Sequence, residues 1–131
     1  MVEKNGKTIA KENRINYHGP YTISELSGVL ESLDVVVMPS MQAEACPLVL
    51  FEALGAGRFV VASSIGSIPE FLGEKGILFP PGDADALYEV LDKVVREPET
   101  VEKALSLPWE PVTQETFVHQ ILELYKRQLS P

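Results

Sequence analysis

Two carboxylates, Glu44 and Glu52, flank the segment of this sequence with the clearest capacity for binding chemistry. Between them, Pro47 opens an apolar stretch of helical length, with proline at the first helical position and Leu48 and Val49 in the first turn. The first N–H groups of a helix lack acceptors within the helix, and together with the helix dipole they form a site for a phosphate. A carboxylate repels a phosphate, so we expect the glutamates to accept hydrogen bonds from hydroxyl groups elsewhere on the ligand. Sugar hydroxyls fit this role.

The elements around this segment indicate a parallel sheet. Residues 34–38 carry a β-branched apolar run without alternation, which is typical of a buried parallel strand, and the strand is expected to stop at Pro39. Residues 59–62 predict the next strand, reached through the helix that begins at Pro47, so the connection is a right-handed parallel crossover. The loop before that helix therefore lies at the carboxyl edge of the sheet, where open α/β folds bind ligands.

A second loop of mostly small residues, 63–67, is expected at the same edge. Gly66 there would let the backbone approach a ligand closely, and a turn that simply needs small residues is the alternative. Downstream, residues 68–72 predict a short helix with proline near its start, residues 76–79 a short strand, and Asp83 the N-cap of a further helix. The apolar stripe of that helix is expected in the core, and it consists of Leu87, Val90, Leu91, Val94 and Val95.

The two ends of the chain are less regular. Residues 1–13 are polar and are expected to form an irregular lead-in, and residues 14–18 predict a further strand that ends at a Gly-Pro turn. A capping-box pattern in residues 22–25 predicts a helix that packs on the sheet through Ile23, Leu26, Leu30 and Leu33. Towards the C-terminus, a short helix is expected between the prolines at 98 and 108. The last helix, from Thr113, carries an apolar stripe that would drive self-association if it were exposed.

Composition excludes several classes of function. A chain of 131 residues with 45% hydrophobic content is long enough to bury the core of one domain. Its formal net charge of -8 disfavours nucleic acid and anionic membranes as partners. Cys46 is the only cysteine, and no apolar run is long enough to span a bilayer, so a cytoplasmic location is the default. His18 and His119 are isolated, and no metal site is expected.

The glutamate pair and the segments after it resemble the donor-binding motif of the family-4 retaining glycosyltransferases of GT-B fold. The resemblance covers about residues 14–96, and the segments that carry it are Pro39-Ser40, Glu44, Glu52-Ala53, the small-residue run with Gly57, and residues 59–62, 64–70 and 76–83. It implies an α/β fold, with a Rossmann-like parallel sheet of about four strands flanked by helices. Residues 14–131 would then form part of the C-terminal, nucleotide-sugar-binding domain. The resemblance implies no metal or cofactor, and a nucleoside-diphosphate sugar as the donor substrate.

The same resemblance implies a role for each site residue. Glu44 is the implied catalytic residue, which contacts the donor sugar near the reacting centre. The amides of Ala45 and Cys46 are expected to hold sugar hydroxyls, and Glu52 is expected to receive the ribose hydroxyls. The complete implied donor-binding set is Ala45, Cys46, Leu48, Val49, Glu52, Gly66, Gly19, Pro20 and Tyr21. For Tyr21, a plain turn from strand to helix is an equal alternative to a place in a pocket for the nucleobase.

The sequence also departs from the family pattern. Ala45, Cys46 and Pro47 stand where glycine or an aromatic residue is frequent, Arg58-Phe59 replaces a common basic-proline pair, and Ser67 stands where a second glycine is common. Family members carry a strand and a helix, before the segment that matches residue 14, whose Arg and Lys neutralise the diphosphate. No such pair exists in residues 1–13, and the N-terminal acceptor domain is expected to be absent as well.

These observations lead to an expected function and to an alternative. The chain is expected to contribute to retaining transfer of a hexose from a nucleoside-diphosphate sugar to a glycan, lipid-linked or small-molecule acceptor. By itself it should be a poor transferase, because a diphosphate held only by helix-start amides lacks a cationic clamp. The alternative is a non-catalytic nucleotide-sugar-binding or assembly module that pairs with an acceptor domain in cis or in trans. A receiver-like signalling domain is disfavoured, since Pro39-Ser40 stands where an acceptor aspartate is needed.

Overall fold

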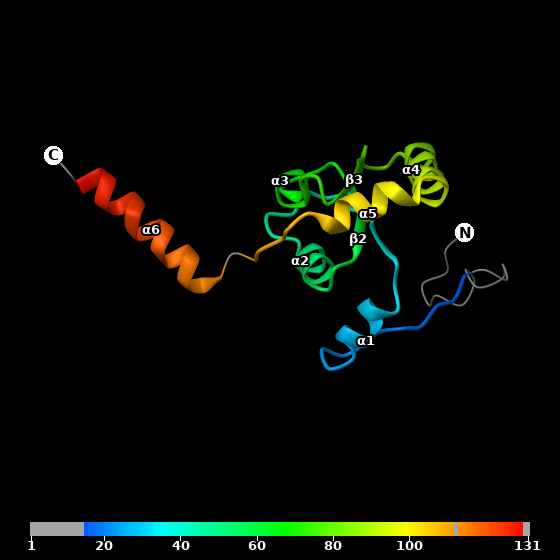
Figure 1. Ribbon diagram of the computed structural model, residues 1–131, viewed down its shortest axis with the longest axis horizontal. Coiled ribbons are helices and arrows are strands. Elements are labelled where there is room, and N and C mark those ends of the chain that lie inside the picture. Colours follow the sequence, from blue (N-terminus) through cyan, green and yellow to red (C-terminus); the bar gives the residue numbers. More distant parts are fainter. Residues whose placement is uncertain (1–14, 112, 130–131) are drawn as a thin grey trace.

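A three-stranded parallel sheet with the order β1-β2-β3 forms the centre of the computed structural model, which describes residues 15–111 and 113–129 (Figure 1). The strands are β1 (Val35–Met38), β2 (Phe59–Ser63) and β3 (Gly76–Phe79). The helices are α1 (Leu26–Glu31), α2 (Leu48–Gly55), α3 (Ile68–Leu72), α4 (Ala84–Arg96), α5 (Pro98–Ser106) and α6 (Gln114–Leu129). Both pairs of strands are parallel, with Val35 opposite Phe59 and Val60 opposite Gly76. The expected lead-in of residues 1–13 lies outside the described residues.

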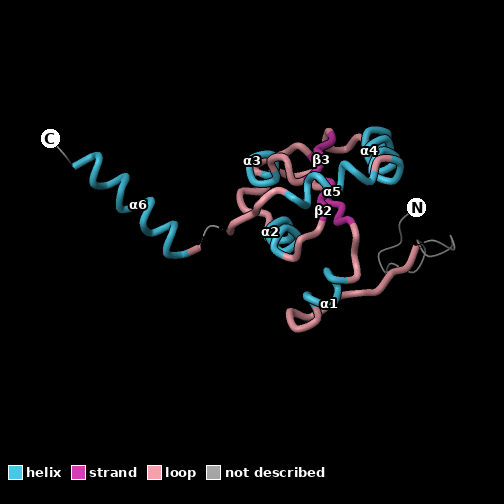
Figure 2. The backbone as a smooth tube through the Cα atoms, viewed as in Figure 1, coloured by secondary structure: helices cyan, strands magenta, loops and turns pink. Residues whose placement is uncertain are grey.

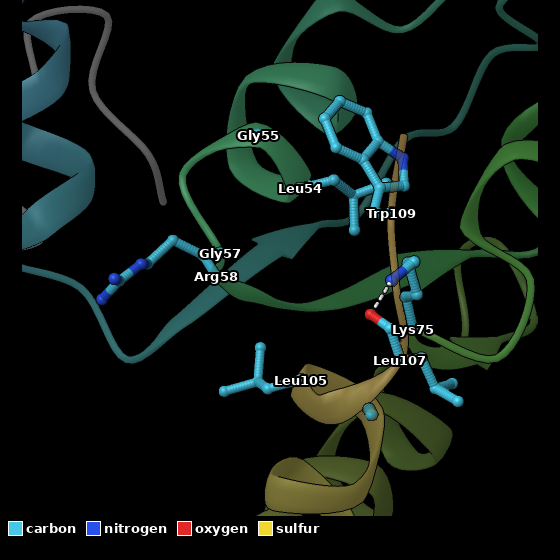
Figure 3. A pocket seen from close by; sticks show the side chains of 9 residues that line it. Leu54, Gly55, Gly57, Arg58, Lys75, Leu105, Leu107 and Trp109 are labelled. Carbon is cyan, nitrogen blue, oxygen red and sulfur yellow. Dashed lines mark hydrogen bonds between the residues drawn. The ribbon is translucent and has the colours of Figure 1, made fainter. Parts of the chain in front are cut away.

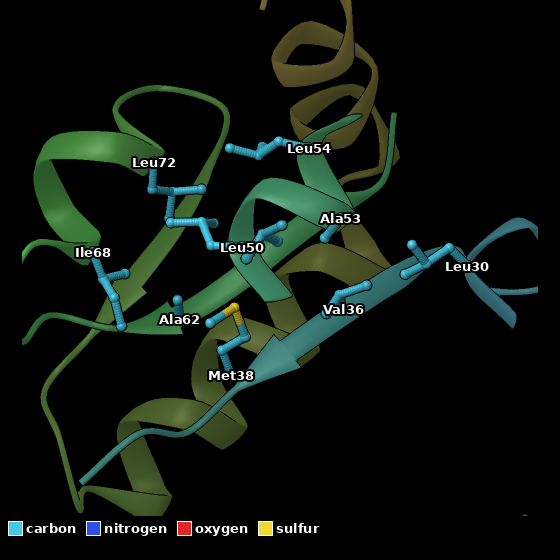
Figure 4. Packing of buried hydrophobic residues seen from close by; sticks show 10 residues of the cluster. Leu30, Val36, Met38, Leu50, Ala53, Leu54, Ala62, Ile68 and Leu72 are labelled. Atoms are coloured by element: carbon cyan, nitrogen blue, oxygen red, sulfur yellow. The ribbon is translucent and has the colours of Figure 1, made fainter. Parts of the chain in front are cut away.

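Helices cover both faces of the sheet, as the backbone trace shows (Figure 2). Successive residues of the central strand alternate between the faces, so Val60 and Ala62 pack with residues of α1, α2 and α3. Phe59 and Val61 pack on the other side, with residues of α4 and α5. All five residues of β2 are buried, which explains why its sequence is apolar without alternation. Figure 4 shows the first of these clusters, in which Leu50 of α2 is fully buried.

Most of the expected elements are confirmed, but the first strand, expected to be buried, is an edge of the described sheet and leaves Val37 39% exposed. The sheet is parallel, residues 59–62 and 76–79 lie in strands, and residues 68–72 form the short helix α3. Asp83 caps α4, because its Oδ1 accepts a hydrogen bond from the N–H of Ala86 at 2.9 Å. The helix between the two prolines is α5, and the last helix, α6, begins at Gln114. The order of elements therefore follows from the pattern of apolar residues from β1 onward.

The strand expected in residues 14–18 is wrong, and the described residues contain three strands in place of about four. Arg14 lies outside the described residues, and residues 15–20 have no regular secondary structure. Ile15 and Tyr17 leave 45% and 65% of their surface exposed. A strand is stable only when a neighbouring strand accepts its hydrogen bonds and a core covers one of its faces, and the described residues give this segment neither.

The helix expected from the capping box begins later than its pattern suggests. Residues 22–25 close as a turn, in which the carboxylate of Glu25 accepts hydrogen bonds from the N–H and the hydroxyl of Thr22 at 2.8 and 2.7 Å. Those bonds lower the pKa of Glu25. Ile23 lies in the turn and is 93% exposed, so its expected packing on the sheet is wrong, whereas Leu30 of α1 is buried.

The apolar stripe of α4 is less buried than expected, and the stripe of α6 is exposed. In α4, Val94 is buried but Val95 is 80% exposed, because neighbouring residues on a helix point about 100° apart. In α6, Phe117, Leu122 and Tyr125 each expose more than half of their surface. Figure 1 shows α6 extending away from the sheet and from the other helices. The apolar stripe of α6 is therefore open to a partner.

Candidate functional site

A hollow of about 410 Å³ lies at the carboxyl end of β1, beside the start of α2. Its lining residues come from the end of β1, from the loop and from the first turn of α2, and they are Met38, Ser40, Glu44, Cys46, Leu48 and Val49. The structure thus brings Glu44 together with three of the expected donor-binding residues. It does so because β1 is parallel to β2, so the loop that follows β1 must lie at the carboxyl edge of the sheet.

The start of α2 presents a group of backbone donors. Pro47 is buried and occupies the N-cap, so α2 begins at Leu48, one position later than expected. Its carbonyl accepts hydrogen bonds from the N–H groups of Leu50 and Phe51, at 3.0 and 3.4 Å. Four N–H groups on either side of Pro47 donate no hydrogen bond to any acceptor in the described part of the chain, and they belong to Ala45, Cys46, Leu48 and Val49. These donors lie at the positive end of the helix dipole and are available to an anion.

The far end of α2 fixes how this helix meets the sheet. Gly57 follows the C-cap with a φ of 67°, and its N–H donates to the carbonyl of Leu54 at 3.0 Å. The N–H of Arg58 donates to the carbonyl of Ala53 at 2.9 Å, which completes a Schellman motif. The helix is thereby turned directly into β2, and its N-terminus is left facing the hollow at the opposite edge.

Glu44 is held through both its side chain and its backbone. The hydroxyl of Ser40 donates to Oε1 of Glu44 at 3.0 Å. The carbonyl of Glu44 accepts two hydrogen bonds from Ser67, one from the N–H at 3.1 Å and one from the hydroxyl at 2.9 Å. Glu44 itself is exposed, so its carboxylate remains open to a ligand. Neither Ser40 nor Ser67 was among the predicted donor-binding residues. Ser67 was noted in the sequence only as a departure from the family pattern.

Gly66 brings the two loops together. Its φ is 59°, and a Cβ added to it would lie 2.7 Å from both the N and the O of Glu44. Only glycine fits so close to another backbone, which explains why a small residue stands here. The close approach predicted for Gly66 is therefore seen against the backbone of Glu44, and an approach to a ligand stays a prediction.

The other expected site residues lie outside the lining of the hollow. Glu52 is half-buried on α2, one turn after Leu48, and its carboxylate accepts no hydrogen bond from the described residues. Ala45 is exposed beside the hollow. Three further expected residues lie in the described segment before α1 and are not part of the lining, namely Gly19, Pro20 and Tyr21.

A second hollow, of about 230 Å³, lies where β2 and β3 begin, at the opposite edge of the sheet (Figure 3). It is lined in part by Arg58, Lys75 and Trp109. Its two cations bond to backbone carbonyls: Arg58 donates to Ala56 and Leu33 at 2.9 and 3.0 Å, and Lys75 donates to Leu107. These bonds tie neighbouring segments to the sheet, so we assign this hollow a structural role.

Neither a membrane helix nor a metal cluster is found in the described part of the chain. None of its helices is long and apolar enough to cross a bilayer. No group of three or more His, Cys, Asp or Glu side chains within residues 15–111 and 113–129 is arranged to hold a metal ion.

Sequence comparison matches residues 3–97 to the family described as glycosyl transferases group 1. A sulfoquinovosyl transferase of Arabidopsis thaliana is 40% identical over 83 residues, which are 60% of this chain and 16% of that protein. A D-inositol 3-phosphate glycosyltransferase of Corynebacterium glutamicum is 34% identical over 75% of this chain and 26% of its own length. A phosphatidyl-myo-inositol mannosyltransferase of Mycobacterium leprae is 30% identical over 86% of this chain and 31% of its own length. The chain therefore spans less than a third of each of these relatives.

Two solved structures share the fold. Sucrose-phosphate synthase from Thermosynechococcus elongatus superposes with a TM-score of 0.64 and 26% identity, over 88% of this chain and 30% of that structure. HepE of Anabaena, solved in complex with UDP, superposes with a TM-score of 0.56 and 25% identity, over 60% of this chain and 22% of that structure.

Proposed function

Because this chain belongs to the group 1 glycosyltransferase family, we propose that it is the C-terminal, donor-binding domain of a family-4 retaining enzyme of GT-B fold. The observation that carries the proposal is the hollow at the carboxyl end of β1, where Glu44 meets the free N–H groups at the start of α2. The enzyme would transfer a hexose from a nucleoside-diphosphate sugar to a glycan, lipid-linked or small-molecule acceptor. We further propose that it acts in the cytoplasm, where its single cysteine stays reduced.

The geometry of the hollow suggests how the donor would lie. The distal phosphate would accept hydrogen bonds from the N–H groups of Leu48 and Val49, at the positive end of the α2 dipole. The sugar would extend towards Glu44, with its hydroxyls on the N–H groups of Ala45 and Cys46. The ribose hydroxyls would donate to Glu52, whose carboxylate has no hydrogen bond from the described residues.

Backbone donors in this position would lower the barrier of the transfer step. When the bond between the anomeric carbon and the diphosphate oxygen breaks, negative charge grows on the departing diphosphate. N–H groups that are already oriented at this charge stabilise it without reorganising during the reaction. No residue that abstracts a proton from the donor is required for that step.

The hollow lacks one component that the proposed reaction needs. Neither lysine nor arginine is among its lining residues, and the one charged side chain there is the carboxylate of Glu44. We therefore propose that a cationic clamp for the diphosphate, together with the acceptor domain, comes from a further segment in cis or from a partner chain in trans. The exposed stripe of α6, which includes Phe117 and Leu122, is a surface on which such a domain or a second copy would pack.

The same lack of a cation favours a second candidate function. A chain that binds a nucleotide sugar but cannot stabilise the leaving diphosphate would act as a binding or assembly module. Transfer activity on mixing with an acceptor domain supports the enzyme, and nucleotide binding without transfer in that mixture supports the module.

Donor binding is tested by titrating the labelled chain with UDP, ADP, GDP and their glucose or mannose conjugates, followed by amide NMR shifts. One nucleotide should shift a cluster of amides that includes Leu48, Val49 and Gly66. Glu52→Ala should abolish these shifts, and the control Glu89→Ala, at an exposed position on α4, should keep them. If no nucleotide shifts any amide at millimolar concentration, the chain has no preformed donor site and the proposal is contradicted.

A further inference from the structure

Ser67 occupies the N-cap of α3, yet its hydroxyl makes no capping bond to that helix. A serine at this position ordinarily accepts a hydrogen bond from an N–H in the first turn of its own helix. Here the hydroxyl donates to the carbonyl of Glu44 at 2.9 Å, across 23 positions of sequence. The N–H of Ser67 donates to the same carbonyl at 3.1 Å. Its side chain is therefore directed at the loop of the candidate site rather than at α3.

The fold makes this contact possible because the two loops leave adjacent parallel strands at the same edge. Met38 at the end of β1 lies opposite Ala62 of β2, so the chain leaves the sheet at nearly the same level in both strands. Gly66 then lets the second loop approach to a distance at which a Cβ would be 2.7 Å from the backbone of Glu44. Ser67 follows directly and reaches the Glu44 carbonyl.

The two bonds fix the orientation of one peptide unit. In a trans peptide the C=O of one residue and the N–H of the next point in opposite directions, so holding the Glu44 carbonyl also sets the direction of the Ala45 N–H. That N–H is one of the donors without an acceptor among the described residues. The Ser40 hydroxyl separately holds the Glu44 carboxylate at 3.0 Å. The loop is thus anchored at the backbone and at the side chain.

We propose that Ser67 is a positioning residue for the donor site, which holds the peptide between Glu44 and Ala45 in the orientation that receives the sugar. The inference rests on the proposed function, because the ligand of this loop is the donor. It also gives a physical role to a serine that stands where the family commonly has glycine, since glycine supplies the N–H bond but not the hydroxyl bond. Orientation fixed before binding improves affinity, because less freedom is lost when the ligand arrives.

The test compares the wild-type chain with Ser67→Ala, which removes the hydroxyl bond, and Ser67→Thr, which restores a hydroxyl. Ser64→Ala is the matched control, because Ser64 is an exposed serine of the same loop whose side chain makes no hydrogen bond with the described residues. Two quantities are measured by NMR: the amide order parameters of Ala45 and Cys46 without ligand, and the Kd of the nucleotide sugar, namely the glucose or mannose conjugate of whichever of UDP, ADP and GDP binds.

We expect the order parameters to fall in Ser67→Ala and its Kd for the nucleotide sugar to rise about three- to tenfold, the loss of roughly one neutral hydrogen bond. Ser67→Thr and Ser64→Ala should behave as the wild type does. Equal Kd values of the nucleotide sugar for the wild type and Ser67→Ala overturn the inference. A weaker Kd with unchanged order parameters also overturns it, because the serine would then contact the ligand directly.

Failure of the proposed function gives a different result. If the wild type binds none of the three nucleotides, the donor site fails, and the order parameters alone decide whether Ser67 positions the loop. A fall in Ser67→Ala that Ser67→Thr reverses supports the positioning role, and unchanged values contradict it.

Discussion

Gly66→Ala should destabilise the protein through the contact between the two loops at the carboxyl edge of the sheet. Gly66 has a φ of 59°, and an added Cβ would lie 2.7 Å from the N and the O of Glu44 and 3.1 Å from Cα of Ala43. All three are backbone atoms, so no flexible side chain can move aside to relieve the clash. The loops must separate, and the two hydrogen bonds from Ser67 to the Glu44 carbonyl must lengthen or break.

The size of the effect follows from three contributions. Alanine in the left-handed region costs about 1–2 kcal/mol relative to glycine. Losing the two hydrogen bonds costs roughly 0.5–1.5 kcal/mol each. Alanine also lowers the conformational entropy of the unfolded chain, which offsets about 0.4–1 kcal/mol of this loss of stability. We therefore expect Gly66→Ala to lower the free energy of unfolding by roughly 1–5 kcal/mol.

Gly57→Ala measures the cost of the left-handed backbone conformation alone. Gly57 has a similar φ of 67°, but a Cβ added there would meet no atom within 4 Å. This variant should lose only about 1 kcal/mol, so the difference between the two variants reports the clash and the broken bonds.

Urea unfolding measures both variants, with the free energy extrapolated linearly to water. Trp109, the only tryptophan, lies beside Gly55 of α2 and provides a fluorescence signal for loss of the packing around the sheet. Equal losses of unfolding free energy in Gly66→Ala and Gly57→Ala would refute the steric argument, because the contact with Glu44 would then have no energetic weight.

Three further predictions concern the core, a helix cap and pH. Leu50→Ala should lower the free energy of unfolding by about 2–5 kcal/mol in urea titrations, because Leu50 is fully buried. The control is Leu48→Ala on the same helix, which should change this free energy by less than about 0.5 kcal/mol because Leu48 is 68% exposed. Asp83→Ala should cost about 1 kcal/mol in the same assay, since it removes the N-cap bond of α4, and an unchanged value would mean that the bond contributes nothing. The pKa of Glu25 should lie below its ordinary value of 4.5, because the carboxylate accepts a hydrogen bond from the N–H of Thr22 and a second, less important one from the Thr22 hydroxyl. The ionised carboxylate of Glu25 therefore contributes stability above pH 4.5, and this contribution is lost as the pH falls through the lowered pKa. An NMR titration of the Glu25 carboxyl group with a midpoint at or above 4.5 would contradict this prediction.

The part of the fold that sequence predicts well is the centre of the sheet. The run 59–62 is apolar without alternation because all of β2 is buried on both faces, so its pattern records its environment directly. Asp83 was recognisable as a cap because capping depends on residues within one turn. The helix start beside Glu44 was likewise predictable, because it depends only on neighbouring residues and on the direction of a parallel strand.

The errors occur where the outcome depends on a partner elsewhere in the chain. Residues 14–18 have the composition of a strand, but the described part of the chain offers them no neighbouring strand, and Tyr17 stays exposed. Ile23 and Val95 continue apolar stripes that α1 and α4 do not bury at these positions. An apolar pattern reports that a side chain would gain from burial, and it does not report whether another element is placed to bury it.

The sequence by itself therefore determined the parallel α/β architecture and the helix start that faces the candidate site, because both follow from local periodicity and from residues close together in the chain. Only the tertiary structure decided how the Glu44 loop is held. The contacts of Gly66 and Ser67 with Glu44 join segments that are more than 20 positions apart, and they exist because two parallel strands end side by side. Such contacts leave no periodic signal in the sequence, since a single glycine and a single serine are enough to make them.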